Sequence, residues 1–264
     1  MTTRDKPWPQ GTPNWVDLGT TDRKAAWEFY QHVFAWTIED SGEEFGHYGM
    51  AMQHGLPVAG LGELPAGSPM PPAWITYLAV DDVDAIVATI EANNGTVLAP
   101  AMDVGDEGRT AIARDPTGGV FGIWQARRHI GASVVNEPNT LCWNELHTRD
   151  PQRARAFYAA VFGWSYEPVG GGTDYSVAHL AEGDEGIGGI GDIDPSLGPE
   201  VPPFWLTYFA VPDADQASGQ SNAMGATVLS GPFDSPNGRM AVIIDPHGAT
   251  FAVLQLAQPE QVEA

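Results

Sequence analysis

An internal repeat constrains the fold of this chain more than any other feature. Residues 15–36, WVDLGTTDRKAAWEFYQHVFAW, align without a gap with residues 143–164, WNELHTRDPQRARAFYAAVFGW, at an offset of 128 and with 10 of 22 positions identical. A second pair repeats further on, since EGRTAIARDPTGGVFGIWQ at 107–125 matches NGRMAVIIDPHGATFAVLQ at 237–255. Self-similarity of this kind indicates copies of one folded unit. The sequence therefore predicts two similar halves.

Within each half, the order strand, helix and three strands occurs twice. Residues 14–20 alternate as a strand does, and Asp22 is a suitable N-cap for a helix whose apolar residues recur at i, i+3 and i+4. After the Pro-rich segment 65–72, the strand WITYLAV and a helix begin the same order again. The sequence thus predicts an α+β fold of four βαβββ modules in two tandem domains, with bounds at 12–126 and 140–256 and a linker at 127–139.

Composition and charge exclude several classes of function. The net charge is −22, from 34 acidic and 12 basic residues, and a polyanion is repelled by nucleic acid and by anionic membranes. No run of about 18 apolar residues occurs, and the first residues lack the apolar region of a signal peptide. We expect a cytoplasmic protein with neither nucleic-acid nor membrane partners. The single cysteine, Cys142, allows no intrachain disulfide and no zinc cluster built on cysteines.

Three features together point to a known family: the four βαβββ modules, the helix pattern AxxFYxxVFGW, and the closing DPxG hairpin. In this combination the chain resembles the vicinal oxygen chelate superfamily, also called the glyoxalase/bleomycin-resistance/dioxygenase family. The resemblance covers nearly the whole chain. It implies that paired modules curl their sheets into open, curved structures whose concave face holds the functional site.

The resemblance also implies a divalent metal, held by a His on the first strand, a His or Glu on the strand after the Pro-rich segment, and a Glu on the last strand. In such a site the ion stabilises an enolate or an oxyanion. In this sequence, the matching positions carry side chains that cannot bind a metal: Trp15 and Trp143, Ile75 and Leu206, and Gly122 and Ala252. We therefore predict that the family's metal site is absent from both halves, and we expect no cofactor.

Polar side chains should still reach the concave face. If Trp143 points inward, the two-residue period of a strand places Glu145 and His147 beside it, about 7 Å apart at Cα. We predict that these two are catalytic, with Glu145 as a base or acceptor and His147 as its partner near neutral pH. Capping of backbone groups or pairing with an arginine is the structural alternative. A displaced metal site formed by Asp17, Glu145 and His147 is a further alternative.

Aromatic residues are expected to line the same face, as suits a flat organic ligand. The alternative is that some of these rings only fill the barrel. The predicted ligand-binding residues are Trp15, Asp17, Tyr77, Trp124, Trp143 and Tyr208.

These observations lead to one main hypothesis and several alternatives. The main hypothesis is a protein that binds a small aromatic or carbonyl-containing molecule and acts as a metal-independent lyase or tailoring enzyme. The first alternative is a protein that sequesters a drug or metabolite without catalysis, and a metal-dependent glyoxalase or dioxygenase is less favoured. No sequence feature supports a protein-interaction role. A monomer or a homodimer is expected, because internal duplication can stand in for dimerisation.

Overall fold

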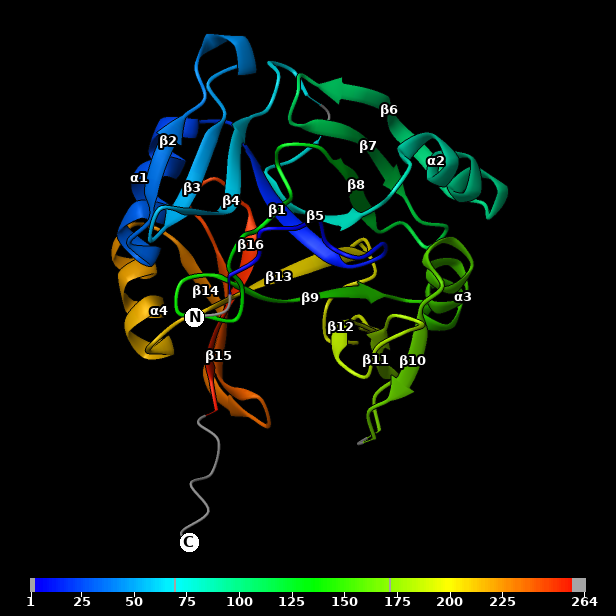
Figure 1. Ribbon diagram of the computed structural model, residues 1–264. Coiled ribbons are helices and arrows are strands. Elements are labelled where there is room, and N and C mark those ends of the chain that lie inside the picture. Colours follow the sequence, from blue (N-terminus) through cyan, green and yellow to red (C-terminus); the bar gives the residue numbers. More distant parts are fainter. Residues whose placement is uncertain (1–2, 69, 171, 258–264) are drawn as a thin grey trace, which may run out of the picture.

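Each half of the chain forms one eight-stranded mixed sheet (Figure 1). In this computed structural model the described residues are 3–68, 70–170 and 172–257. The first sheet has the order β2 (Thr37–Asp40), β3 (Gly49–Gln53), β4 (Leu56–Glu63), β1 (Pro13–Thr20), β5 (Ala73–Ala79), β8 (Val120–Ala126), β7 (Gly108–Arg114) and β6 (Thr96–Val104). The second has the order β10 (Ser165–Pro168), β11 (Tyr175–His179), β12 (Gly186–Asp192), β9 (Leu141–Thr148), β13 (Phe204–Ala210), β16 (Thr250–Leu256), β15 (Gly238–Ile244) and β14 (Thr227–Ser235).

The two halves share the same strand pairing, both within a module and between the two modules of a half. Within a module the first strand is parallel to the last, as in β1 with β4 and β9 with β12. The modules of one half meet through an antiparallel pair, β1 with β5 and β9 with β13. This arrangement confirms the predicted α+β fold with four βαβββ modules.

Each module has one helix, and each helix begins at an aspartate. The helices are α1 (Arg23–Phe34), α2 (Val83–Ala92), α3 (Pro151–Phe162) and α4 (Ala214–Ala223), and a 3₁₀ turn covers Glu43–Phe45. The N-cap side chains of Asp22, Asp82, Asp150 and Asp213 each accept a hydrogen bond from the backbone N–H three residues later. These bonds satisfy one of the free donors in each first turn. Among the described residues, no helix is long and apolar enough to cross a membrane.

The two sheets curve in opposite directions, and the helices lie at their sides (Figure 1). Helix α1 lies beside α4, and α2 lies beside α3, so each helix pair takes one member from each half. The two largest buried clusters follow the same division. One joins the first module to the fourth, and the other joins the second module to the third. These buried clusters contain residues from both halves, and the predicted linker at 127–139 stays a prediction.

A buried hydrogen bond between the halves occurs twice, once in each cluster. The hydroxyl of Tyr30 donates to Asp245 at 2.9 Å, and that of Tyr158 donates to Asp115 at 3.0 Å. Both aspartates belong to the repeated DPxG turns, and each is only 3% exposed. The other oxygen of Asp115 accepts from the backbone of its own turn. The helix of one half is thereby fixed to the hairpin of the other.

We predict that Tyr158→Phe lowers the free energy of unfolding by about 2–3 kcal/mol, because it removes a donor from a buried carboxylate. It also removes the acceptor of the Trp205 indole N–H. Chemical denaturation followed by fluorescence measures the change, and we expect a single transition because the buried clusters join the two halves. Tyr166→Phe is the matched control, since this buried hydroxyl has no partner in the described structure. Equal losses in the two variants would contradict the role given to the Tyr158–Asp115 bond.

Candidate functional site

The strands β1 and β9 each present one face to the core and the other to the concave side of their sheet. In β1, Val16 and Leu18 belong to the buried cluster that contains helix α1. Because side chains alternate along a strand, Trp15 and Asp17 point to the opposite face. By the same rule, Leu146 is in the core and Glu145 faces the concave side.

Glu145 lies at the centre of a hydrogen-bonded group in the second half. Its carboxylate accepts from His147 Nε2 at 2.8 Å, from the Tyr208 hydroxyl at 2.5 Å and from the Tyr175 hydroxyl at 2.8 Å. The indole N–H of Trp143 donates to the Tyr175 hydroxyl at 3.1 Å. The structure thus brings together four predicted site residues and adds Tyr175, which was not predicted. We call these five residues the Glu145 group.

The protonation of Glu145 and His147 follows from their contact. Burial acts to raise the pKa of Glu145, but His147 and the two tyrosine hydroxyls together hold it below its ordinary value. Burial acts to lower the pKa of His147, but the neighbouring carboxylate raises it overall. The second ring nitrogen, Nδ1, lies 3.4 Å from the carbonyl oxygen of Asp192. Since both nitrogens face acceptors, a charged imidazolium beside a carboxylate is the expected state at neutral pH.

An apolar surface adjoins the Glu145 group. Leu206, Ala252 and Leu254 are buried with Tyr208, and further apolar side chains that pack against them keep part of their surface exposed. The ring of His147 stacks on Phe204 with 5.0 Å between ring centroids. An apolar face with a few convergent polar groups is the usual composition of a small-molecule site.

The first half carries a corresponding group around Asp17, but without a histidine. The indole N–H of Trp15 donates to the Tyr48 hydroxyl at 3.1 Å, as Trp143 does to Tyr175. Tyr77 forms a hydrogen bond with Asp17, as Tyr208 does with Glu145. We call Trp15, Asp17, Tyr48 and Tyr77 the Asp17 group. Burial raises the pKa of Asp17 to about 7, and the hydrogen bond of Tyr77 lowers it only in part.

His129, which was not predicted, contacts both Trp124 and the Asp17 group. The imidazole of His129, which follows β8, contacts Trp15 edge-on at 4.4 Å and Trp124 at 5.5 Å between ring centroids. The Trp124 indole N–H donates to the His129 backbone oxygen at 2.8 Å. Burial lowers the pKa of His129 to about 4, so this ring is neutral at physiological pH.

Tyr48 and Tyr175 are the functional candidates that the sequence prediction missed. Each stands at the start of the second hairpin of its module, and its ring lies against glycines of the next strand. An added Cβ at Gly60 would collide with the Tyr48 hydroxyl, and one at Gly189 would collide with the Tyr175 hydroxyl. The repeated glycines in GLG and GIG, together with a tyrosine just before β3 and another at the start of β11, are the signal that could have revealed both residues.

The family's metal does not fit these residues, and the structure gives a steric reason. A side chain at Gly122 would collide with the ring of Tyr77, which occupies the space that a glutamate would need. In the second half, Ala252 is fully buried and stands opposite Tyr208 in the strand register. Within the described residues, no three His, Cys, Asp or Glu side chains gather as a metal site. Asp17 and Glu145 belong to different sheets, so the alternative site that combined them with His147 is not formed.

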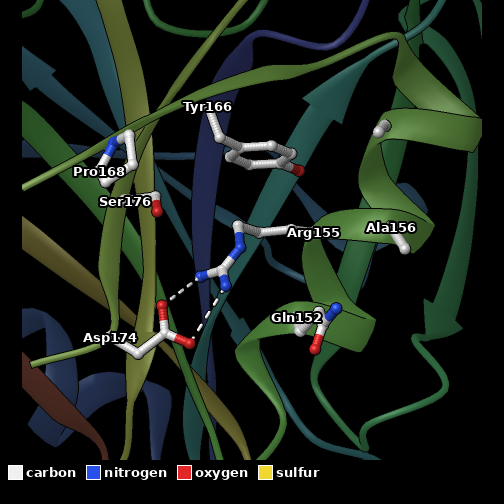
Figure 2. A pocket seen from close by; sticks show the side chains of 8 residues that line it. Gln152, Arg155, Ala156, Tyr166, Pro168, Asp174 and Ser176 are labelled. Atoms are coloured by element: carbon white, nitrogen blue, oxygen red, sulfur yellow. Dashed lines mark hydrogen bonds and ion pairs between the residues drawn. The ribbon is translucent and has the colours of Figure 1, made fainter.

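Two cavities are found elsewhere on the described structure. One, of about 370 Å³, lies between α3 and the strands β10 and β11, where the Arg155 guanidinium pairs with Asp174 beside the ring of Tyr166 (Figure 2). The other, of about 160 Å³, includes Trp124 and Asn14 in its wall. Neither cavity is lined by the Glu145 group. Solvent reaches this group at the partly exposed side chains of Trp143, His147 and Tyr175.

Comparison with known proteins agrees with the fold and the repeat. Residues 12–123 and 140–253 each match the Glyoxalase/Bleomycin resistance protein/Dioxygenase superfamily. The chain therefore belongs to this superfamily, in its form with two tandem units.

Among its relatives, the chain is 48% identical to "Putative glyoxylase CFP32" of Mycobacterium tuberculosis, over 96% of this chain and 97% of that protein. It is 34% identical to "Anthracycline biosynthesis protein DnrV" of Streptomyces peucetius, over 94% of each. Among solved structures, the Mn(II)-bound glyoxalase from Novosphingobium aromaticivorans superposes with a TM-score of 0.63 at 16% identity, covering 97% of this chain and 87% of that one. The last similarity shows the fold alone.

We predict that Glu145→Gln moves the pKa of His147 from above its ordinary value to below it. The reason is that the raising influence of the carboxylate is lost while burial remains. Titration of the imidazole protons by NMR measures this change, and the other histidines serve as internal controls. An unchanged pKa for His147 would mean that the pair is not formed in solution.

We predict that Asp17→Asn stabilises the protein at alkaline pH. With a pKa of about 7 in the fold against an ordinary 3.8, ionisation above about pH 4 favours the unfolded chain and costs about 2–4 kcal/mol by pH 8. Asparagine cannot ionise and avoids this cost. Denaturation should show the variant and the parent protein converging near pH 4 and separating as the pH rises to 8. A constant difference at every pH would contradict the raised pKa.

Proposed function

We propose that this protein binds a small, flat, aromatic or carbonyl-containing molecule on the concave face of one or both sheets. The observation that carries the proposal is the Glu145 group, in which four polar side chains and Trp143 converge beside a partly exposed apolar surface. The similarity to a protein named for anthracycline biosynthesis supports a fused aromatic ligand of that kind. Trp15, Asp17, Tyr77 and Trp124 would take the corresponding role in the first half. A cytoplasmic location remains part of this proposal.

The chemistry that suits the second half is metal-independent lyase or tailoring chemistry. The 3.4 Å contact between His147 Nδ1 and the Asp192 carbonyl oxygen is at the limit of a hydrogen bond, so this N–H is available to a ligand oxygen. A charged N–H directed at a carbonyl stabilises negative charge that develops on its oxygen. In this scheme Glu145 holds the imidazolium, and its low pKa makes it an orienting partner more than a base.

Sequestration without catalysis is the second candidate, and a specific observation favours it. Glu145 already accepts three hydrogen bonds, one of them from Nε2 of His147. A carboxylate occupied in this way can orient a side chain that recognises a ligand without itself taking part in proton transfer. A metal-dependent glyoxalase or dioxygenase is the least suitable function, since the side chains at the family's ligand positions cannot bind an ion.

The test uses a water-soluble hydroxyanthraquinone as the probe and calorimetry with tryptophan fluorescence as the readout. We expect saturable binding with quenching, because the chain has 9 tryptophans, of which Trp15 and Trp143 belong to the two groups and Trp124 lies beside one of them. If the protein is an enzyme, His147→Ala should retain binding within about threefold and lower turnover of a bound substrate by at least about a hundredfold.

Controls separate the alternatives. Glu145→Gln should follow His147→Ala in turnover, whereas Asp184→Asn, in an exposed turn, should change neither binding nor turnover. Binding without turnover of any bound carbonyl compound would support sequestration. Absence of binding in the millimolar range would refute the proposal, and a stoichiometric divalent metal in the purified protein would refute its metal-independent chemistry.

A further inference from the structure

Asp17 and Glu145 occupy equivalent positions in the two halves but have different neighbours. Glu145 has the His147 imidazole two residues later as its counter-charge, at 2.8 Å. The position two residues after Asp17 is Gly19, and the strand pairing that sets Phe204 opposite His147 sets Ala73 opposite Gly19. The first half therefore lacks both rings of the stacked His147–Phe204 pair.

No side chain replaces the missing positive charge. Among the described residues Asp17 forms no ion pair, and its one hydrogen-bonding side chain is the neutral hydroxyl of Tyr77. The imidazole of His129, which contacts Trp15, is neutral because burial lowers its pKa to about 4. A partly buried carboxylate without a cation is costly, and the raised pKa of Asp17 expresses that cost.

The surroundings of Asp17 favour a positively charged organic group. Trp15, Tyr48 and Tyr77 adjoin the carboxylate, and Trp124 extends this aromatic set through His129. Aromatic rings attract ammonium and guanidinium groups most strongly where water is excluded. The net charge of −22 adds a general attraction for cations.

We propose that the first half binds an organic cation, with an ammonium-type group placed against Asp17 where the second half has the His147 imidazolium against Glu145. The inference rests on the proposed binding role of the concave faces and assigns the first of them a ligand class of its own. The two halves then differ in chemistry: the second supplies the positive charge itself, and the first takes it from the ligand.

Gly19 and Ala73 take the positions of His147 and Phe204, and both keep part of their surface exposed. A Cβ at Gly19 would lie 2.8 Å from Cδ2 of Leu64, a methyl group at the end of a rotatable side chain. Leu64 itself is partly exposed, so a change of rotamer can move it aside. We expect a cationic head group of ammonium size to approach the carboxylate from this side once Leu64 has turned away.

The experiment compares benzyltrimethylammonium, which carries a permanent charge, with neutral benzyl alcohol, by calorimetry on the full-length protein. We expect the cation to bind at least about tenfold more tightly than the alcohol. Asp17→Asn should abolish this preference, and the loss of a buried charge does not endanger its folding. Asp84→Asn is the matched control: it changes the net charge equally, at a side chain that is 67% exposed and paired with Arg109.

Three outcomes would overturn the inference: equal affinity for the two probes, a preference that survives in Asp17→Asn, or a preference lost in Glu145→Gln, which would place the cation in the second half. Failure of the proposed function is recognised separately. If the hydroxyanthraquinone binds while no preference for the cation is found, only this inference is wrong, whereas absence of binding by all three probes refutes both.

Discussion

The structure depends on a buried contact that each half makes with the other: a helix tyrosine bound to the aspartate of the partner's DPxG turn. Tyr30 with Asp245 and Tyr158 with Asp115 are the two examples. Around each bond, aromatic rings of one half pack against those of the other, as Phe34 does against Phe209. The helices and the convex faces are used in this association. The concave faces remain available for ligands.

Much of the fold could be predicted from the sequence, because the same pattern of strands and helices occurs in both halves. The N-cap aspartates and the alternation in the strands gave the order of elements, and a period of two placed Asp17 and Glu145 on the correct face. Sequence analysis missed Tyr48, Tyr175 and His129. The glycines of GLG and GIG are a local sign of the two tyrosines, but the strand on which each ring lies depends on how the strands pair. His129 lies in a connecting segment, where no strand or helix pattern places its ring.

The electrostatic state of the site was also beyond sequence analysis. Glu145 and His147 were predicted to share one face and act together, and the structure adds a direct hydrogen bond between them. The two tyrosine hydroxyls that donate to Glu145 and help to lower its pKa come from β11 and β13, which meet Glu145 only in the folded sheet. The two halves surround their carboxylates with similar aromatic residues, but His147 gives Glu145 a positive partner, whereas Gly19 leaves Asp17 without one.

The ring of Tyr77 over Gly122 has a consequence for how this lineage can change. Restoring a glutamate at that position would require removal of the tyrosine, and Asp17 would then lose its hydrogen-bonding partner. A glutamate at position 122 therefore requires a second change at position 77, and that second change alters the surroundings of Asp17 as well.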